Sequence, residues 1–179
     1  MRIKRLVLFI DSTTRYWAIA AGWILMFLTL YISADVILRK LIQKSIQGSD
    51  EVGGYTLAIL CAFGFSWTLK NRAHIRLNLI LKRLPATVQV FINFLAYFIL
   101  AGFAYAMLWR GAAMVIESAQ LSATAPTPLL TPLILPQGVW LFGIIWFSIQ
   151  LTFYLVQLVL LIIQKKYDEF LQDYGVDAD

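Results

Sequence analysis

Four long runs of apolar residues divide the chain, and polar or Pro-rich stretches separate them. The runs cover about residues 16–34, 52–69, 87–109 and 137–163. A helix needs about 20 predominantly apolar residues to cross the hydrocarbon core of a bilayer, and each run is close to that length or longer. Because none of them contains a Pro, the pattern predicts four uninterrupted transmembrane helices.

The first helix is expected to continue past its apolar run. Asp35 precedes Arg39 by four residues, a spacing that brings an acid and a base together on a helix surface. The stretch 36–47 then alternates apolar and basic residues, and Gly48 breaks it. The residues Ser49, Asp50 and Glu51 that follow are suited to cap the second helix.

Small residues recur at every fourth position of the second run. They are Gly54, Ala58, Ala62 and Ser66. This spacing places them on one face of a helix, where a neighbouring helix can approach closely. We interpret them as a packing face, either within this chain or against a partner; chance placement in a chain rich in Gly and Ala is the alternative.

The segment 72–84 is too short and too charged to span a bilayer, and it predicts an amphipathic helix at the membrane surface. Leu77, Ile80, Leu81 and Leu84 form an apolar stripe with helical spacing. Four basic residues that lie away from this stripe, and that we expect to face lipid headgroups, are Arg72, Arg76, Lys82 and Arg83. Pro85 then ends this helix and opens the third span.

His74 lies within this basic segment. A histidine titrates near neutral pH, so a pH-sensing role is one interpretation. The interpretation that we favour is structural: His74 caps the carbonyl end of the second span or bonds a partner subunit.

The connection between the third and fourth spans is rich in Pro. The third helix is expected to continue to about Glu117, and 122–136 then contains four of the five prolines. Such a density of Pro excludes a long helix. Pro136 directly precedes the fourth span.

Basic residues predict the orientation of the chain. Eleven of the 15 Lys and Arg residues lie in the N-terminal segment, the connection between spans two and three, or the C-terminal tail, and four lie in the other two connections. Cytoplasmic segments carry the excess of Lys and Arg, so both termini are predicted to be cytoplasmic. The formal net charge of +5 is explained by this bias, and no nucleic acid partner is expected.

Composition argues against most enzyme classes. Sixty per cent of the residues are hydrophobic and 14% are charged, whereas soluble domains have about 25% charged residues. The chain has a single His, no HExxH motif, no Gly-rich phosphate loop and no nucleophile elbow. We therefore expect no catalytic residue, no cofactor and no metal site. Helices broken at membrane depth, which form the substrate sites of transporters, are also not predicted.

Two stretches resemble the small membrane subunit of TRAP (tripartite ATP-independent periplasmic) transporters, the DctQ-like or Q subunit. The first is 50–85, with an acid before span two, a Gly within it, a basic segment with His-Ile, and a closing Leu-Pro. The matching positions are Glu51, Gly64, Arg72, His74, Ile75, Leu77, Leu84 and Pro85. The second stretch, 127–137, is similar to the Pro-rich start of the family's fourth span.

The resemblance implies an all-α integral membrane protein, a single membrane domain over residues 1–179 in the bacterial inner membrane. It implies a non-catalytic subunit that packs on the scaffold of a large multi-span transport subunit and extends it. The large subunit carries an organic anion, commonly a carboxylate, together with sodium, and a periplasmic substrate-binding protein delivers the anion. Membrane lipids are the remaining partners. The alternative is an anchor or assembly subunit of another inner-membrane complex.

Overall fold

The computed structural model describes residues 2–71 and 84–165, and they form four α-helices. These are α1 (Arg2–Ile42), α2 (Ser49–Lys70), α4 (Ala86–Gln120) and α5 (Ile134–Ile163). Each is long and apolar enough to cross a membrane. Within the described ranges there is no strand, only an isolated bridge between Thr124 and Pro132. The predicted all-α fold with four helices able to span a membrane is therefore confirmed for the described residues. The predicted interfacial helix over 72–84 lies almost entirely outside them.

The helices are longer than the apolar runs that predicted them. The N-terminal charged segment is part of α1, and at the other end α1 continues past Asp35 to Ile42. It stops before Gly48, because Gln43 takes a positive φ of 57° and so leaves the helical conformation. Charged side chains end the contact of a helix with lipid, but they do not end its backbone hydrogen bonding.

The start of α2 differs from the prediction that a polar side chain caps it. Gly48 occupies the N-cap position with φ of 81°, and no side chain caps the helix. The hydroxyl of Ser49 instead donates to a carboxylate oxygen of Asp35 at 3.1 Å. Ser49 is thus used to join α2 to α1.

Prolines mark the beginnings of the two later helices. Pro85 is the N-cap of α4, and its carbonyl accepts from the amides of Val88 and Gln89 at 2.9 and 3.1 Å. Pro136 is the third residue of α5. There its missing N–H costs no intrahelical hydrogen bond, since the first helical N–H groups have no partner within the helix. The predicted fourth span therefore begins slightly earlier than expected.

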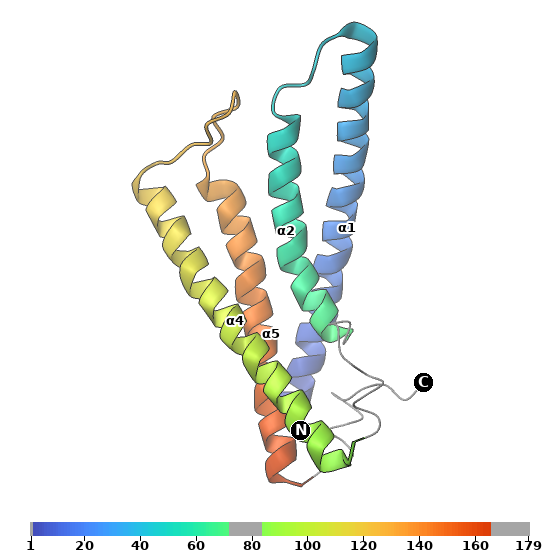
Figure 1. Ribbon diagram of the computed structural model, residues 1–179, viewed down its shortest axis with the longest axis vertical. Helices are drawn as coiled ribbons and strands as arrows, with labels where there is room; N and C mark the ends of the chain where they lie inside the picture. Colours follow the sequence, from blue (N-terminus) through green and yellow to red (C-terminus); the bar gives the residue numbers. More distant parts are fainter. Residues whose placement is uncertain (1, 72–83, 166–179) are drawn as a thin grey trace.

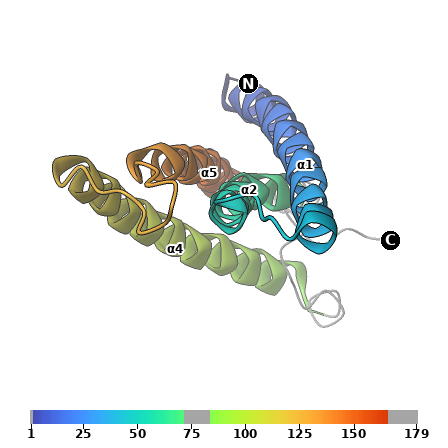
Figure 2. The same cartoon turned by 90° about the horizontal axis from the view of Figure 1, so that it is seen from above.

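The four helices form two hairpins that meet at α5 (Figure 1). α1 packs on α2, α4 packs on α5, and α5 also contacts α2 and α1. From above, α4 and α1 lie on the outside, with α5 and α2 between them (Figure 2). The hairpins diverge toward the two short connections, and α2 ends well before the neighbouring ends of α4 and α5 (Figure 1).

The core is centred on α5. Phe147, Leu151 and Leu158 are almost completely buried there, and they pack with Tyr97 and Ala101 of α4. Contact between α5 and α2 is close at Gly143, where an added Cβ would lie 2.8 Å from the Cβ of Ala62. Small residues thus allow the two backbones to approach, as is usual for helices packed in lipid.

Candidate functional site

The residues of the predicted packing face have two different environments. Ala62 and Ser66 are buried, and Ala62 contacts Gly143 of α5. Gly54 and Ala58 are exposed, and an added Cβ at Gly54 would meet nothing within 4 Å. The half of this face that is nearer the C-terminus of α2 is therefore buried, with Ala62 against α5, and the other half is open.

Glu51 joins the start of α2 to the connection between α4 and α5. One of its carboxylate oxygens accepts a hydrogen bond from the hydroxyl of Thr127, and the other accepts from the phenol of Tyr55 at 2.9 Å. The side chain of Leu129 lies against Gly48, where a Cβ would be 2.1 Å from its Cδ1. Since Gly48 also has φ of 81°, the backbone conformation and the position of the Leu129 side chain both favour glycine there.

An apolar cavity of about 260 Å³ lies between α2 and α5. Its walls are formed by Tyr55 and Ala58 of α2, Met114 of α4, and Pro136 and Trp140 of α5, together with Leu133 and Gln137. Both stretches that resemble the TRAP small subunit thus contribute to one region, since Glu51, Tyr55 and Ala58 come from the first and Thr127, Pro136 and Gln137 come from the second.

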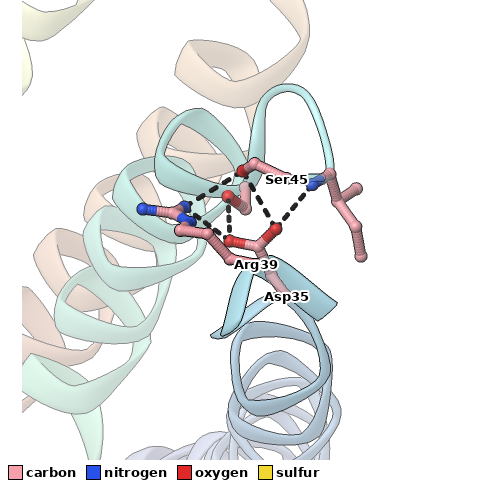
Figure 3. A network of polar contacts seen from close by, with 5 residues as sticks. Asp35, Arg39 and Ser45 are labelled. Atoms are coloured by element: carbon pink, nitrogen blue, oxygen red, sulfur yellow. Dashed lines mark hydrogen bonds and ion pairs between the residues drawn. The ribbon is translucent and has the colours of Figure 1, made fainter. Parts of the chain in front are cut away.

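Asp35 is the centre of a polar network where α1 turns into α2 (Figure 3). It is only 2% exposed and forms the predicted ion pair with Arg39 at 2.7 Å. It also accepts hydrogen bonds from the hydroxyl of Ser45 at 3.1 Å and the amide of Ile46 at 2.5 Å, in addition to that from Ser49. The sequence indicated the pair with Arg39. Of the other three donors, Ser49 is the first residue of α2, and Ser45 and Ile46 come from a connection whose path no periodic pattern specifies.

A second polar cluster joins α1, α2 and α5, and sequence analysis missed it. One carboxylate oxygen of Asp11 accepts from the phenol of Tyr154 at 2.7 Å and from the amide of Gln150 at 3.1 Å. Lys70 donates to the backbone carbonyl of Asp11 at 2.8 Å. The fully buried Thr14 accepts from the indole of Trp146 at 3.0 Å. The available signal was an acid one turn before Thr14, with a Gln and a Tyr four residues apart in the fourth span.

The remaining predicted residues lie outside the described part of the chain. These are His74 and the basic residues Arg72, Arg76, Lys82 and Arg83. Their roles stay predictions. Among the described residues, no three His, Cys, Asp or Glu side chains come together in a group that is able to hold a metal ion.

The two polar clusters and the cavity therefore have the properties of helix-joining and packing elements. Each charged group described above is bonded to groups of neighbouring helices or connections, and the cavity walls are almost entirely apolar. In lipid, such contacts hold helices together where the hydrophobic effect does not.

Comparison with known families decides the identity. The chain matches the family described as tripartite ATP-independent periplasmic transporters, DctQ component, over residues 28–163, which is more than half of its length. The chain belongs to this family. No match was found among curated proteins or among solved structures.

Membership of the DctQ family makes the chain a TRAP transporter small subunit and a multi-pass membrane protein. The family is a transporter component and not a known enzyme family, and it works with a large subunit and a substrate-binding protein. The matched range covers the Asp35 network, Glu51 and the Pro-rich connection, but it begins after Asp11 and Thr14. The contacts that attach the N-terminal part of α1 to α5 therefore join α1 residues outside the matched region to α5 residues within it.

Proposed function

We propose that this chain is the non-catalytic small membrane subunit of a sodium-coupled secondary transporter for an organic anion of the carboxylate type. In this proposal it packs on the fixed scaffold of the large transport subunit and extends that scaffold within the bilayer. A periplasmic substrate-binding protein delivers the anion. The chain lies in the bacterial inner membrane with both termini in the cytoplasm, as the distribution of Lys and Arg favours.

The uncovered surface of α1 is the observation that best supports a scaffold role. In its most apolar stretch 11% of the residues are buried, compared with 50% in α5. Large apolar side chains such as Trp23, Phe27 and Leu30 are more than half exposed. A helix that is attached to its own subunit along one narrow face offers the rest of its surface to a partner helix or to lipid.

The continuity of the helices supports a role without transport. Among the described residues, α1, α2, α4 and α5 each run without a break through their apolar stretch. Transport sites are typically formed where helices are interrupted at membrane depth, so that backbone groups can coordinate ions and substrate. The substrate pathway therefore belongs to the large subunit in this proposal.

Substitutions on α1 test which surface binds the large subunit. Trp23 and Phe27 lie near each other, with tilted rings whose centroids are 6.3 Å apart. Replacing both by Ala is expected to lower the amount of large subunit that co-purifies with this chain, because aromatic side chains dominate the energy of interfaces. The matched control is the double replacement of the exposed Phe91 and Phe98 on α4. Equal losses for both pairs, or no loss for the α1 pair, would contradict the assignment of α1 to the interface.

A further inference from the structure

One face of α4 carries an acid, a base and apolar residues in a fixed order. From the connected end of the helix inward they are Glu117, Met114, Arg110, Met107 and Phe103. Their spacings of three and four residues place them on the same side of the helix. Four of these residues line a groove of about 470 Å³ that Trp140 of α5 borders, and Phe103, which is 56% exposed, continues the face below it.

Both charges in this groove are available to a ligand. Neither Arg110 nor Glu117 forms an ion pair with a described residue. The guanidinium of Arg110 lies over the ring of its neighbour Trp109, 6.0 Å from the ring centroid. α4 packs chiefly on α5, so the chain itself leaves the outer faces of this helix uncovered.

The order of the charges matches one class of lipid. Glu117 follows Arg110 by seven positions, which is about 10 Å along a helix. Both side chains are long and flexible, so that the two charged groups are able to approach a common ligand. Glu117 lies near the end of α4 at Gln120, and Met107 and Phe103 lie toward the middle of the span. A phospholipid with an ethanolamine headgroup has its ammonium outermost, its phosphate next and its acyl chains innermost.

We propose that this groove binds an aminophospholipid of the outer leaflet. Glu117 accepts hydrogen bonds from the primary ammonium, Arg110 binds the phosphate, and an acyl chain runs along Met107 and Phe103. Trp109 and Trp140 flank the headgroup, and Trp is enriched at membrane interfaces for this purpose. The assignment of the site to the outer leaflet rests on the orientation given under the proposed function, whereas the chemistry of the site is independent of that orientation.

Charge complementarity favours this lipid over other occupants. An anionic lipid such as phosphatidylglycerol satisfies Arg110 but leaves Glu117 without a cation. Phosphatidylcholine supplies a positive charge without an N–H donor, so its contact with Glu117 is weaker. An apolar helix of a partner subunit leaves both charges unpaired, which is costly in lipid.

Native mass spectrometry of the purified full chain tests the proposal. The chain is titrated in detergent with phosphatidylethanolamine, phosphatidylcholine or phosphatidylglycerol of identical acyl chains. We expect phosphatidylethanolamine to bind about fivefold more tightly than either other lipid, the difference that one favourable charged contact at a membrane surface provides.

Two variants divide the site into its parts. Glu117→Gln is expected to remove the preference for phosphatidylethanolamine while leaving phosphatidylglycerol binding unchanged. Arg110→Gln is expected to weaken the binding of all three lipids. Matched controls are Asp50→Asn and Lys44→Gln, which alter an exposed acid and an exposed base near the same end of the bundle and are expected to leave binding as in the wild type.

Equal binding of the three lipids by the wild-type chain would overturn the proposal, as would wild-type selectivity in both Glu117→Gln and Arg110→Gln. A variant that unfolds is recognised by loss of its melting transition. The double conservative variant Arg110→Lys with Glu117→Asp is then measured in its place. We expect this variant to retain the selectivity for phosphatidylethanolamine, and loss of its lipid binding would count against the site. The readout requires neither transport nor a partner subunit. Failure of lipid binding is therefore separable from failure of the transporter assignment.

Discussion

Individual polar residues hold this bundle together at positions where apolar packing ends. Asp35 is the clearest case, since its buried carboxylate accepts hydrogen bonds from a side chain of α1, two groups of the following connection and Ser49 of α2. Several hydrogen-bond donors stabilise a buried carboxylate. When the carboxylate is removed, these donors are left without an acceptor, which lowers the stability of the folded chain. The turn between α1 and α2 therefore depends on one side chain.

Replacing Asp35 by Ala is expected to lower the stability of the purified chain by about 1–3 kcal/mol, because the amide of Ile46 and the hydroxyl of the buried Ser49 lose their acceptor. The measurement is thermal melting in detergent. Asp50→Ala serves as the control, since Asp50 is an exposed acid one residue after Ser49. Identical melting of the two variants would show that the Asp35 network adds nothing to stability.

The polar residues also show where sequence reasoning reached its limit. The pair of Asp35 with Arg39 followed from helical spacing, because both residues lie on one helix. The contacts of Asp11 with Gln150 and Tyr154 join residues far apart in the chain, so they depend on how α1 and α5 cross. Hydrophobic periodicity specifies which residues share a face, but it does not specify which helix that face meets.

At the scale of the helices, the apolar runs predicted the existence of α1, α2, α4 and α5, but not their ends. Apolar composition reports contact with lipid, and a helix continues beyond it until a residue such as Gln43 or a Pro-rich stretch interrupts the backbone. The small-residue face of α2 shows the same limit. Its spacing was visible in the sequence, whereas the division into a buried half and an open half was not.

This division of the face predicts different effects of substitution at Ala58 and Ala62, which lie one helical turn apart. Ala62→Leu is expected to destabilise the chain by about 1–3 kcal/mol, because the larger side chain meets Gly143 in a tightly packed contact. Ala58→Leu is expected to be tolerated in the isolated chain, since Ala58 borders the apolar cavity. Both variants are compared with the wild type by thermal melting in detergent.

The same two substitutions, Ala58→Leu and Ala62→Leu, test whether the open half of the face binds the large subunit. If the open half of the face receives the large subunit, Ala58→Leu reduces co-purification without changing the melting of the isolated chain. Equal destabilisation by both substitutions would contradict the division of the face seen in the structure.

At the scale of the whole molecule, two hairpins share α5 as their common support. The connection between α4 and α5 reaches back to α2 through Thr127 and Leu129, so both hairpins are joined at the end where they diverge (Figure 1). Such an arrangement favours a rigid unit over a moving one. This agrees with the proposed role, in which the subunit supports transport by the large subunit.

Topology is the first property to test at this scale. Reporter fusions at both ends of the chain are expected to be active in the cytoplasm, and fusions within 43–48 and 121–133 are expected to be active in the periplasm, because the Lys and Arg excess lies on the side of the termini. Periplasmic activity at either terminus would reverse the orientation. The lipid site on α4 would then face the inner leaflet.

In the proposed function, transport by the large subunit needs this chain, although this chain does not itself transport. The most direct measurement is sodium-driven uptake of candidate carboxylates into proteoliposomes that contain this chain alone, its large subunit alone, or both together, each with the cognate periplasmic binding protein. We predict background uptake for either subunit alone and sodium-dependent uptake for the pair. Uptake by this chain alone, or full uptake by the large subunit without it, would contradict the proposed role.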